Sequence, residues 1–343
     1  MELRDLMERQ KLPLDVKIYY SKKKIEEFFE DYKGNVYLSM SGADSAVLDF
    51  VCKQTKYNSQ IERVSVAGAE PPENIKFLLE RRVNTLPMGI DKKSVIIKYG
   101  YPVVSKAQAM AISRYHNTKS PEQKEKRLNG YIGANGQLIR NGKIADKYRE
   151  LVYAPFMGSD ACCDKFKKKP LKKYEAQSGK YPITGELAEE SINRTRQYLK
   201  YGCIMHDAKR PKCTPLGFWT KQDILECIKI NNIEIPSIYG EVITHGNELK
   251  FSGEPRTGCD VCGFGLHLDP ERLTRLKARN KKMYDYMLGG GQWVEGSITR
   301  PMRRYYGGPI EESNLYWVPS KESFGYRPVL EYVFSMLGVD FEF

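Results

Sequence analysis

The stretch that most constrains this chain is residues 36–50, which reads as a strand, a turn of small residues and the start of a helix. Residues 36–40 are β-branched, aromatic and apolar, residues 41–45 turn the chain, and residues 46–51 follow a helical pattern. The unpaired N–H groups and the dipole of the first helical turn favour an anion there. We therefore expect a phosphate-binding turn. An ordinary strand-to-helix turn, with Asp44 or Ser45 as its N-cap, is the alternative.

Length and composition predict a soluble globular protein with one large domain and appendages. The chain has 343 residues, of which 41% are hydrophobic and 29% charged. Its first residues are charged, and no apolar run is long enough to cross a bilayer. We expect no contact with a membrane and a cytoplasmic location.

Charge and cysteine content suggest partners and cofactors. The net charge of +12 fits a polyanion such as nucleic acid, although a solvated surface of this length can carry the same excess. Eight cysteines in a cytoplasmic chain indicate metal or redox roles before disulfides. The spacing of the cysteines is therefore the next feature to interpret.

Four cysteines form two close pairs, Cys162–Cys163 and Cys259-x-x-Cys262, with 95 residues between them. Together the pairs can supply four thiolates to zinc or to an iron–sulfur cluster, and spacing alone does not choose between them. Cys203 and Cys213 are either structural, redox-active or substitutes for one of these ligands. Cys52 and Cys227 lie in apolar helical patterns and are expected in the core.

Other segments predict further strands and helices around the turn. A strand at 61–66 leads to Gly68 and Glu70, as at the carboxyl end of a parallel strand. Residues 94–98 read as a strand, and 182–185 as a short strand before a helix that carries Glu190 and Arg194. Thr220 and Asp223 have the spacing of a capping box. A basic helix is expected over 270–288.

The order of these motifs resembles the phosphoadenosine phosphosulfate (PAPS) reductase family. This family belongs to the PP-loop ATP-pyrophosphatase-like (adenine nucleotide alpha hydrolase) superfamily, and its iron–sulfur members bind a 4Fe-4S cluster through a Cys-Cys pair and a distant Cys-x-x-Cys pair. The resemblance runs over residues 36–276. It implies that the nucleotide-binding residues are Ser39, Ser41, Gly42, Asp44, Ser45, Gly68, Glu70, Gly185 and Glu190, with Arg194 beside them, and that the cluster ligands are Cys162, Cys163, Cys259 and Cys262.

The resemblance also implies the fold and its divisions. We expect a Rossmann-like parallel sheet with helices on both faces, an α/β class fold. A helical segment would span 1–32 and the α/β domain 33–245, with an insertion near 107–150. The Cys-x-x-Cys pair and basic helix would occupy 246–288, and a C-terminal extension 289–343.

Two departures from the family pattern bear on activity. The family's loop reads Ser-Gly-Gly-x-Asp-Ser, whereas Ser41-Gly-Ala-Asp-Ser45 is one residue shorter or, aligned without a gap, has Met40 and Ser41 where Ser and Gly are expected. The reductases use a C-terminal cysteine as nucleophile, and no cysteine follows Cys262 in this chain. These differences favour a different reaction of the same nucleotide class.

The function expected from the sequence is an ATP-using enzyme of sulfur metabolism. It would cleave ATP to AMP and pyrophosphate with Mg²⁺, activating an acceptor such as DNA or tRNA for sulfur transfer from a donor protein. Asp44, Lys106 and Arg194 are the candidate catalytic residues. A sulfonucleotide reductase is the second hypothesis. A non-catalytic nucleic-acid-binding protein with a structural metal, zinc or cluster, is the third.

Overall fold

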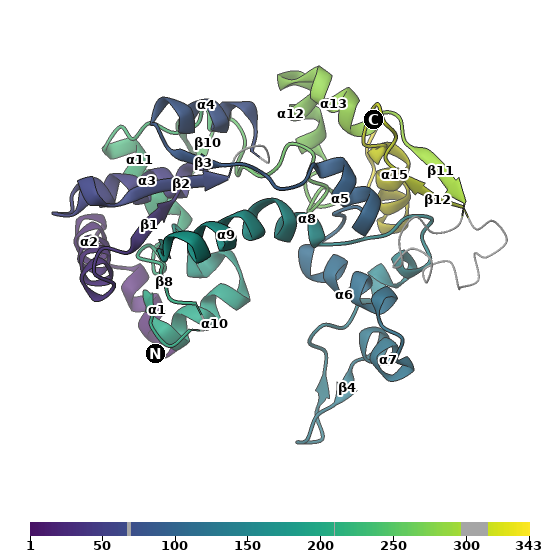
Figure 1. Cartoon of the computed structure of the whole chain (residues 1–343), viewed down its shortest axis with the longest axis horizontal. Coiled ribbons are helices and arrows are strands. Elements are labelled where there is room, and N and C mark those ends of the chain that lie inside the picture. The colour runs from purple at the N-terminus through teal and green to yellow at the C-terminus, as the bar shows by residue number, and fades with distance from the viewer. Residues whose placement is uncertain (67–69, 209, 296–314) are drawn as a thin grey trace. The chain divides into compact units, whose positions relative to one another are not determined.

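The computed structural model describes residues 1–66, 70–208, 210–295 and 315–343, and the chain divides into two compact units (Figure 1). Unit 1 comprises Met1–Pro87 and Pro170–Gly258, and unit 2 comprises Met88–Lys169 and Cys259–Phe343. Each unit is therefore built from two separate stretches of chain. The segment 33–245, expected as one domain, contributes to both units.

Unit 1 is organised around a six-stranded sheet. Its strands, in spatial order, are β3 (Asn84–Leu86), β2 (Glu62–Val66), β1 (Val36–Ser39), β6 (Tyr181–Ile183), β8 (Lys212–Cys213) and β7 (Ile204–Met205). Neighbouring strands are parallel except for the β7–β8 pair. β1 pairs on both edges, and its first three residues are at most 1% exposed, which explains its continuous apolar run. The predicted α/β class is confirmed.

Helices and one hairpin complete unit 1. Buried side chains of the helices, including Phe28, Leu48 and Ile224, pack in one core with Val36 and Leu38 of β1. The elements are α1 (Leu3–Gln10), α2 (Leu14–Asp31), α3 (Ala43–Lys53), η1 (Asn58–Gln60), α4 (Pro72–Glu80), α9 (Lys169–Ser178, which begins at the last residue of a unit 2 stretch), η4 (Ala188–Glu190), α10 (Ile192–Tyr201), α11 (Lys221–Ile230), η5 (Ser237–Tyr239) and the hairpin β9 (Val242–His245) to β10 (Glu248–Phe251).

The order of the strands places a switch point beside β1. From β1 the chain continues to β2 and β3 on one side, whereas β6 and β8 lie on the other side. In open parallel sheets, ligands bind outside the carboxyl ends of the strands at such a point. The turn that follows β1 and the segment that follows β6 both lie there.

Unit 2 is mainly helical, with a separate core that includes Tyr101, Phe156, Tyr316 and Tyr326. Its elements are α5 (Lys92–Tyr99), α6 (Lys106–Asn117), α7 (Pro121–Asn129), the hairpin β4 (Tyr131–Ile132) to β5 (Leu138–Ile139), η2 (Asp146–Val152), α8 (Ala161–Cys163), the π-helical turn η3 (Asp164–Lys168), α12 (Glu271–Arg279), α13 (Lys281–Leu288), the pair β11 (Gln292–Glu295) and β12 (Leu315–Val318), and α15 (Tyr326–Leu337).

Two secondary-structure predictions were wrong. Residues 94–98 belong to helix α5, because the Asp91 carboxylate caps the Ser94 N–H at 2.8 Å and Gly100, at φ +104°, ends the helix. These local caps outweigh the β-branched residues between them. The helix expected over 270–288 is broken at Asn280, whose side chain accepts from the Met283 N–H and starts α13.

Among the described residues, no helix has both the length and the apolar character needed to cross a bilayer.

Candidate functional site

The turn after β1 is held by its own serines. The Ser41 N–H donates to Ser45 Oγ at 2.8 Å, and the Ser45 hydroxyl donates to the Gly42 carbonyl at 2.7 Å. Helix α3 begins at Ala43 with Gly42 as its N-cap and no capping side chain. The alternative of an N-cap at Asp44 or Ser45 was therefore wrong. The turn keeps its shape through these two bonds, while Ser39 ends β1 directly before it.

The second strand-end motif meets this turn. The Ser41 hydroxyl donates to Glu70 Oε1 at 3.1 Å, and Glu70 is only 7% exposed. The Asn74 amide donates to the other Glu70 oxygen at 3.4 Å and to the Ser41 carbonyl at 3.3 Å. Two of the motifs singled out in the sequence are thus joined by hydrogen bonds. Gly68 lies outside the described residues.

Gly185 lies against the first turn of α3. A Cβ atom at Gly185 would stand 3.0 Å from the Asp44 carbonyl oxygen and 3.3 Å from the Ser45 nitrogen. Only a glycine lets the segment after β6 pass this close without a shift of the backbone. Gly185, which the sequence singled out, therefore packs the segment after β6 against the start of α3 at the switch point.

Tyr239 covers part of the turn. Its hydroxyl accepts from the Ala43 N–H at 3.1 Å and shares a 2.7 Å hydrogen bond with Thr257 Oγ1. A side chain at Gly42 would collide with the same hydroxyl. Burial raises the pKa of Tyr239, so the hydroxyl stays protonated. One N–H group that a phosphate would use is thus already satisfied within the chain.

Lys221 brings a positive charge to the turn. Its ammonium nitrogen lies 2.9 Å from Asp44 Oδ1, and these two side chains are 36% and 32% exposed. Lys221 is the first residue of α11, where Thr220 and Asp223 form the predicted capping box, which is confirmed. The sequence located the cap but missed Lys221 and Tyr239, because both reach the turn only through tertiary packing.

Glu190 and Arg194 form an ion pair with each other. Glu190 lies on η4 rather than on the expected helix, where it accepts from the Leu187 N–H at 3.1 Å, and Arg194 lies on α10. In the part of the chain that the structure describes, no hydrogen bond joins either side chain to residues 39–45. These two residues belong to the same unit as the turn but not to its hydrogen-bond network.

All four paired cysteines line one cavity of unit 2. Cys162 lies on α8, Cys163 ends that helix, and Cys259 and Cys262 form a turn closed by a 3.0 Å bond from the Cys262 N–H to the Cys259 carbonyl. The rest of the lining is mostly apolar and comprises Lys92, Ile96, Pro102, Phe166, Lys167, Val261 and Tyr326. The fold therefore brings the two distant pairs together.

By their chemistry the four thiols can serve either zinc or an iron–sulfur cluster. Sulfurs bound to one tetrahedral zinc stand about 3.8 Å apart, given a Zn–S distance of about 2.3 Å. Within the described ranges, the single group of three potential ligands whose atoms all lie within 4.8 Å of one another is Glu27, Asp31 and His206. A four-iron cluster needs wider spacing because each sulfur binds a different iron, whereas Cys162 and Cys163 are near enough to share a hydrogen bond. Either metal centre therefore requires the thiols to shift.

Positive charge surrounds one of the thiols. The hydrogen bond with the Cys162 thiol lowers the pKa of Cys163, and the ammonium groups of Lys106 and Lys167 lower it further. The same hydrogen bond raises the pKa of Cys162, as does burial. Lys106 starts α6 and belongs to unit 2, so the structure places this candidate catalytic residue beside the cysteines.

Neighbouring groups fix the Cys-x-x-Cys turn. The Tyr326 hydroxyl donates to the Val261 carbonyl at 2.9 Å, and the Arg272 guanidinium donates to the Cys262 carbonyl. A side chain at Gly263 would collide with the Pro102 carbonyl. These contacts hold the backbone of the turn that carries Cys259 and Cys262 in place.

The remaining four cysteines lie in the core of unit 1. Cys52, Cys203, Cys213 and Cys227 are all at most 6% exposed. Burial raises the pKa of Cys203 to about 11 and that of Cys213 well above its usual range. Neither Cys203 nor Cys213 lines the cysteine cavity. The prediction of core positions for Cys52 and Cys227 is confirmed.

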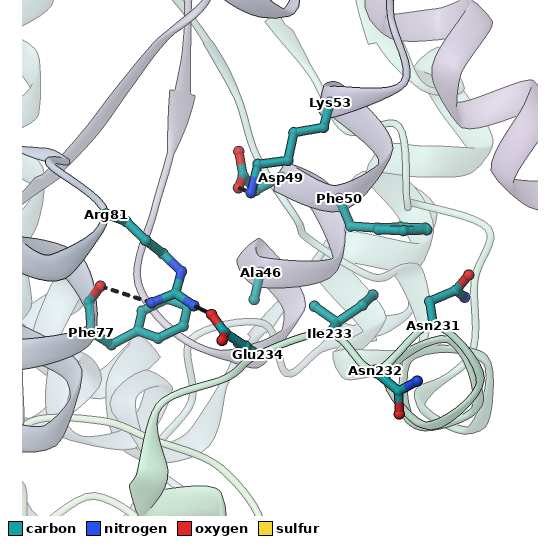
Figure 2. A pocket seen from close by; sticks show the side chains of 10 residues that line it. All are labelled: Ala46, Asp49, Phe50, Lys53, Phe77, Arg81, Asn231, Asn232, Ile233 and Glu234. Atoms are coloured by element: carbon teal, nitrogen blue, oxygen red, sulfur yellow. Dashed lines mark hydrogen bonds and ion pairs between the residues drawn. The ribbon is translucent and has the colours of Figure 1, made fainter.

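Unit 1 has a pocket of about 200 Å³ that opens beside α3 (Figure 2). Its charged side chains are paired, Lys53 with Asp49 at 2.9 Å and Arg81 with Glu234. Arg81 also covers the ring of Phe77 at 3.7 Å. None of the residues that the sequence marked for a site lines it, and its charges satisfy each other.

Comparison with known proteins adds one structural likeness. No protein-family model matches the chain, and no curated protein matches it significantly. Among solved structures, the chain is similar to the crystal structure of PAPS reductase from Candida auris in its phosphate complex, with 11% identity and a TM-score of 0.32. The match covers 59% of this chain and 75% of that chain. A likeness this low does not place the chain in that family.

Proposed function

We propose that unit 1 binds an adenine nucleotide at the switch point and cleaves ATP to AMP and pyrophosphate, activating an acceptor for sulfur transfer. The supporting observation is the packing of Gly185 against the first turn of α3, beside a turn of small residues and at the carboxyl ends of parallel strands. A helix N-terminus at the carboxyl ends of parallel strands, beside a switch point, is where open α/β sheets bind phosphates.

Residues around the turn would have separate roles in the cleavage of ATP. Attack of an acceptor oxygen on the α-phosphorus would break its bond to the bridging oxygen, releasing pyrophosphate and leaving AMP on the acceptor; a sulfur donor would then displace AMP. N–H groups of residues 42–45 would bind phosphate. Asp44 would hold Mg²⁺, and Lys221, released from its pair with Asp44, would offset the charge on the leaving pyrophosphate.

We further propose that the cysteine cavity of unit 2 holds a 4Fe-4S cluster. Four cysteines that line one cavity and its mostly apolar lining support this. Such a cluster would supply electron transfer. Lys106 and Lys167 would offset the negative charge of a cluster bound by four thiolates.

One observation favours a second function, nucleotide binding without turnover. The Tyr239 hydroxyl already satisfies the Ala43 N–H and blocks space above Gly42. Turnover requires this hydroxyl to move or to contact the phosphate itself. Sulfonucleotide reduction has less support, since it needs a nucleophilic thiol, and Cys203 and Cys213 are buried in the core.

The test is release of AMP, followed with ATP labelled at the α-phosphate, and of pyrophosphate, followed with ATP labelled at the γ-phosphate, with Mg²⁺, with duplex DNA or tRNA as acceptor and with sulfide as the sulfur donor. We expect AMP from the wild type and a large loss in Asp44→Asn. Binding of ATP without AMP release under every condition would support the second function. Release of sulfite from adenylylsulfate or PAPS with a thiol reductant would support the reductase instead.

A further inference from the structure

The excess positive charge of this protein lies in unit 2. Unit 1 has 27 Lys and Arg against 25 Asp and Glu, whereas unit 2 has 28 against 18. Unit 2 therefore carries a net charge of +10 out of the total of +12. The candidate nucleotide site does not account for this charge, because it belongs to unit 1.

Much of the charge comes from one segment, residues 106–149, which we call the basic excursion. It contains ten Lys and Arg and only three Asp and Glu. It comprises α6, α7 and the β4–β5 hairpin, in which Tyr131 pairs with Ile139. Figure 1 shows the β4–β5 hairpin, in the middle of this segment, projecting beyond α6 and α7.

Several of these cations have no acidic partner. Arg114, Lys119, Arg140 and Lys147 are exposed, and within the described ranges none of them forms an ion pair. Lys143 behaves differently, because it pairs with Asp146 at 3.0 Å. An unpaired, exposed cation keeps its full attraction for an external anion, whereas a paired one does not.

The hairpin adds exposed apolar side chains to this charge. Ile132 is 65% exposed, Leu138 is 47% exposed and Tyr131 is 39% exposed. Lys126 lies 5.3 Å from the centre of the Tyr131 ring, so a cation accompanies the hairpin. Apolar side chains on a projecting hairpin, with Lys126 beside it and Arg140 directly after it in the chain, suit insertion into a groove lined by phosphates.

We propose that the basic excursion binds duplex DNA, with the exposed cations on the phosphates and the β4–β5 hairpin in a groove. The B-DNA major groove admits a two-stranded ribbon, whereas the major groove of duplex RNA is too narrow for side chains to read. Binding of single strands uses stacked aromatic rings, and Tyr131 is the one aromatic residue of the hairpin. The proposal goes beyond nucleotide cleavage and depends only on unit 2.

The experiment is fluorescence anisotropy of the full chain with a labelled duplex of about 30 base pairs, without nucleotide, over a range of salt concentrations. The test variant changes Arg114, Lys119, Arg140 and Lys147 to Ala. We expect at least a tenfold weaker affinity, and a slope of log affinity against log salt that falls by about 3 to 4, because each phosphate contact contributes about 0.9. Circular dichroism checks that the variant folds.

A matched control removes the same charge from unit 1 by changing Lys33, Lys200, Lys229 and Lys250 to Ala, none of which forms an ion pair within the described residues. All four are exposed lysines, and we expect binding to remain within about twofold of the wild type. An equal loss of DNA affinity in both variants would overturn the proposal, because it would show that binding depends on the total charge of the protein and not on the basic excursion. Tighter binding of RNA or single-stranded DNA than of the duplex would overturn the choice of duplex DNA.

A second variant tests the hairpin separately. Changing Ile132 and Leu138 to Ser keeps the charge of the excursion but removes its exposed apolar contacts. We expect affinity to fall about threefold to tenfold with an unchanged salt slope. Unchanged affinity would show that the hairpin does not enter a groove. Because these assays contain no ATP, their outcome is independent of whether unit 1 cleaves it.

Discussion

The two candidate sites differ in how their polar groups are satisfied. In unit 1, groups of the turn after β1 donate hydrogen bonds to Ser45, Glu70 and Tyr239, all within the chain. In unit 2, four cysteines line one mostly apolar cavity. A phosphate must therefore displace or rearrange internal bonds to bind, whereas the proposed cluster would bind thiols that line one cavity. The unit 1 turn holds its shape through its own hydrogen bonds, and the proposal for unit 2 adds a cofactor to its site.

The largest expected effect is loss of the cluster. Cys163→Ser removes one of the four thiols, so the brown colour and nearly all of about four iron atoms per chain should be lost. Cys203→Ala, which alters a core cysteine of unit 1, should retain the iron. Absorbance near 400 nm and iron analysis of both variants provide the measurement. If Cys203→Ala lost its iron while Cys163→Ser kept it, Cys203 rather than Cys163 would be the ligand.

A side chain at Gly185 should disrupt the nucleotide site. Gly185→Val places atoms within about 3 Å of the Asp44 carbonyl, so the turn must shift, and kcat/KM for AMP release should fall roughly 100-fold. Gly89→Val is the control, because a Cβ there meets no atom within 4 Å. Full activity in Gly185→Val would exclude this turn as the phosphate site.

Acid should destabilise unit 2 before unit 1. Burial, with a smaller effect of Lys124, lowers the pKa of His116 to about 3, whereas an unfolded histidine has a pKa of about 6.5. Between these values the unfolded state binds the extra proton, so stability falls as the pH drops below about 6.5. From pH 6.5 to pH 5 the loss is about 2 kcal/mol.

Urea unfolding at pH 7 and pH 5 measures this loss. His116→Phe should make unfolding of unit 2 less sensitive to acid, although the pKa of His267 in the same unit is also lowered by burial. In unit 1 both histidines, His206 and His245, are exposed, so its unfolding should change less. An unaltered acid response in His116→Phe would contradict the assignment.

The smallest effect concerns the tyrosine that covers the turn. Tyr239→Phe removes the hydroxyl that accepts from the Ala43 N–H, which should cost about 1 kcal/mol of stability yet tighten nucleotide binding a few-fold. Tyr198→Phe removes another buried hydroxyl of unit 1, bonded to Arg9 at 3.2 Å, and should lose stability without altering affinity. Calorimetric titration with ATP measures both. Weaker binding in Tyr239→Phe would mean that the hydroxyl contacts the nucleotide.

Local patterns in the sequence predicted the centre of unit 1 well. The strand, turn and helix of residues 36–50 depend on neighbouring residues, and Glu70 and Gly185 could be expected nearby because parallel strands end at one edge. The same reasoning failed at residues 94–98, where β-branched residues suggested a strand but the Asp91 cap selects a helix. Propensity decides only where capping and packing do not.

Contacts between residues far apart in the chain could not be predicted from the sequence. Tyr239 and Lys221 reach the turn from elements about 200 residues later in the chain, and no local pattern marks them. Lys106 was expected near the nucleotide, yet it starts a helix of unit 2 beside Cys163. The division of the chain into two units, each from two stretches, likewise depends on contacts that no single segment encodes.

The central claim is that the four cysteines of unit 2 bind a 4Fe-4S cluster. The most direct measurement is the iron, sulfide and zinc content of the wild-type chain purified without oxygen. If the cluster is bound, the protein will be brown and will contain about four iron and four sulfide per chain. Colourless protein with one zinc and no sulfide would contradict it.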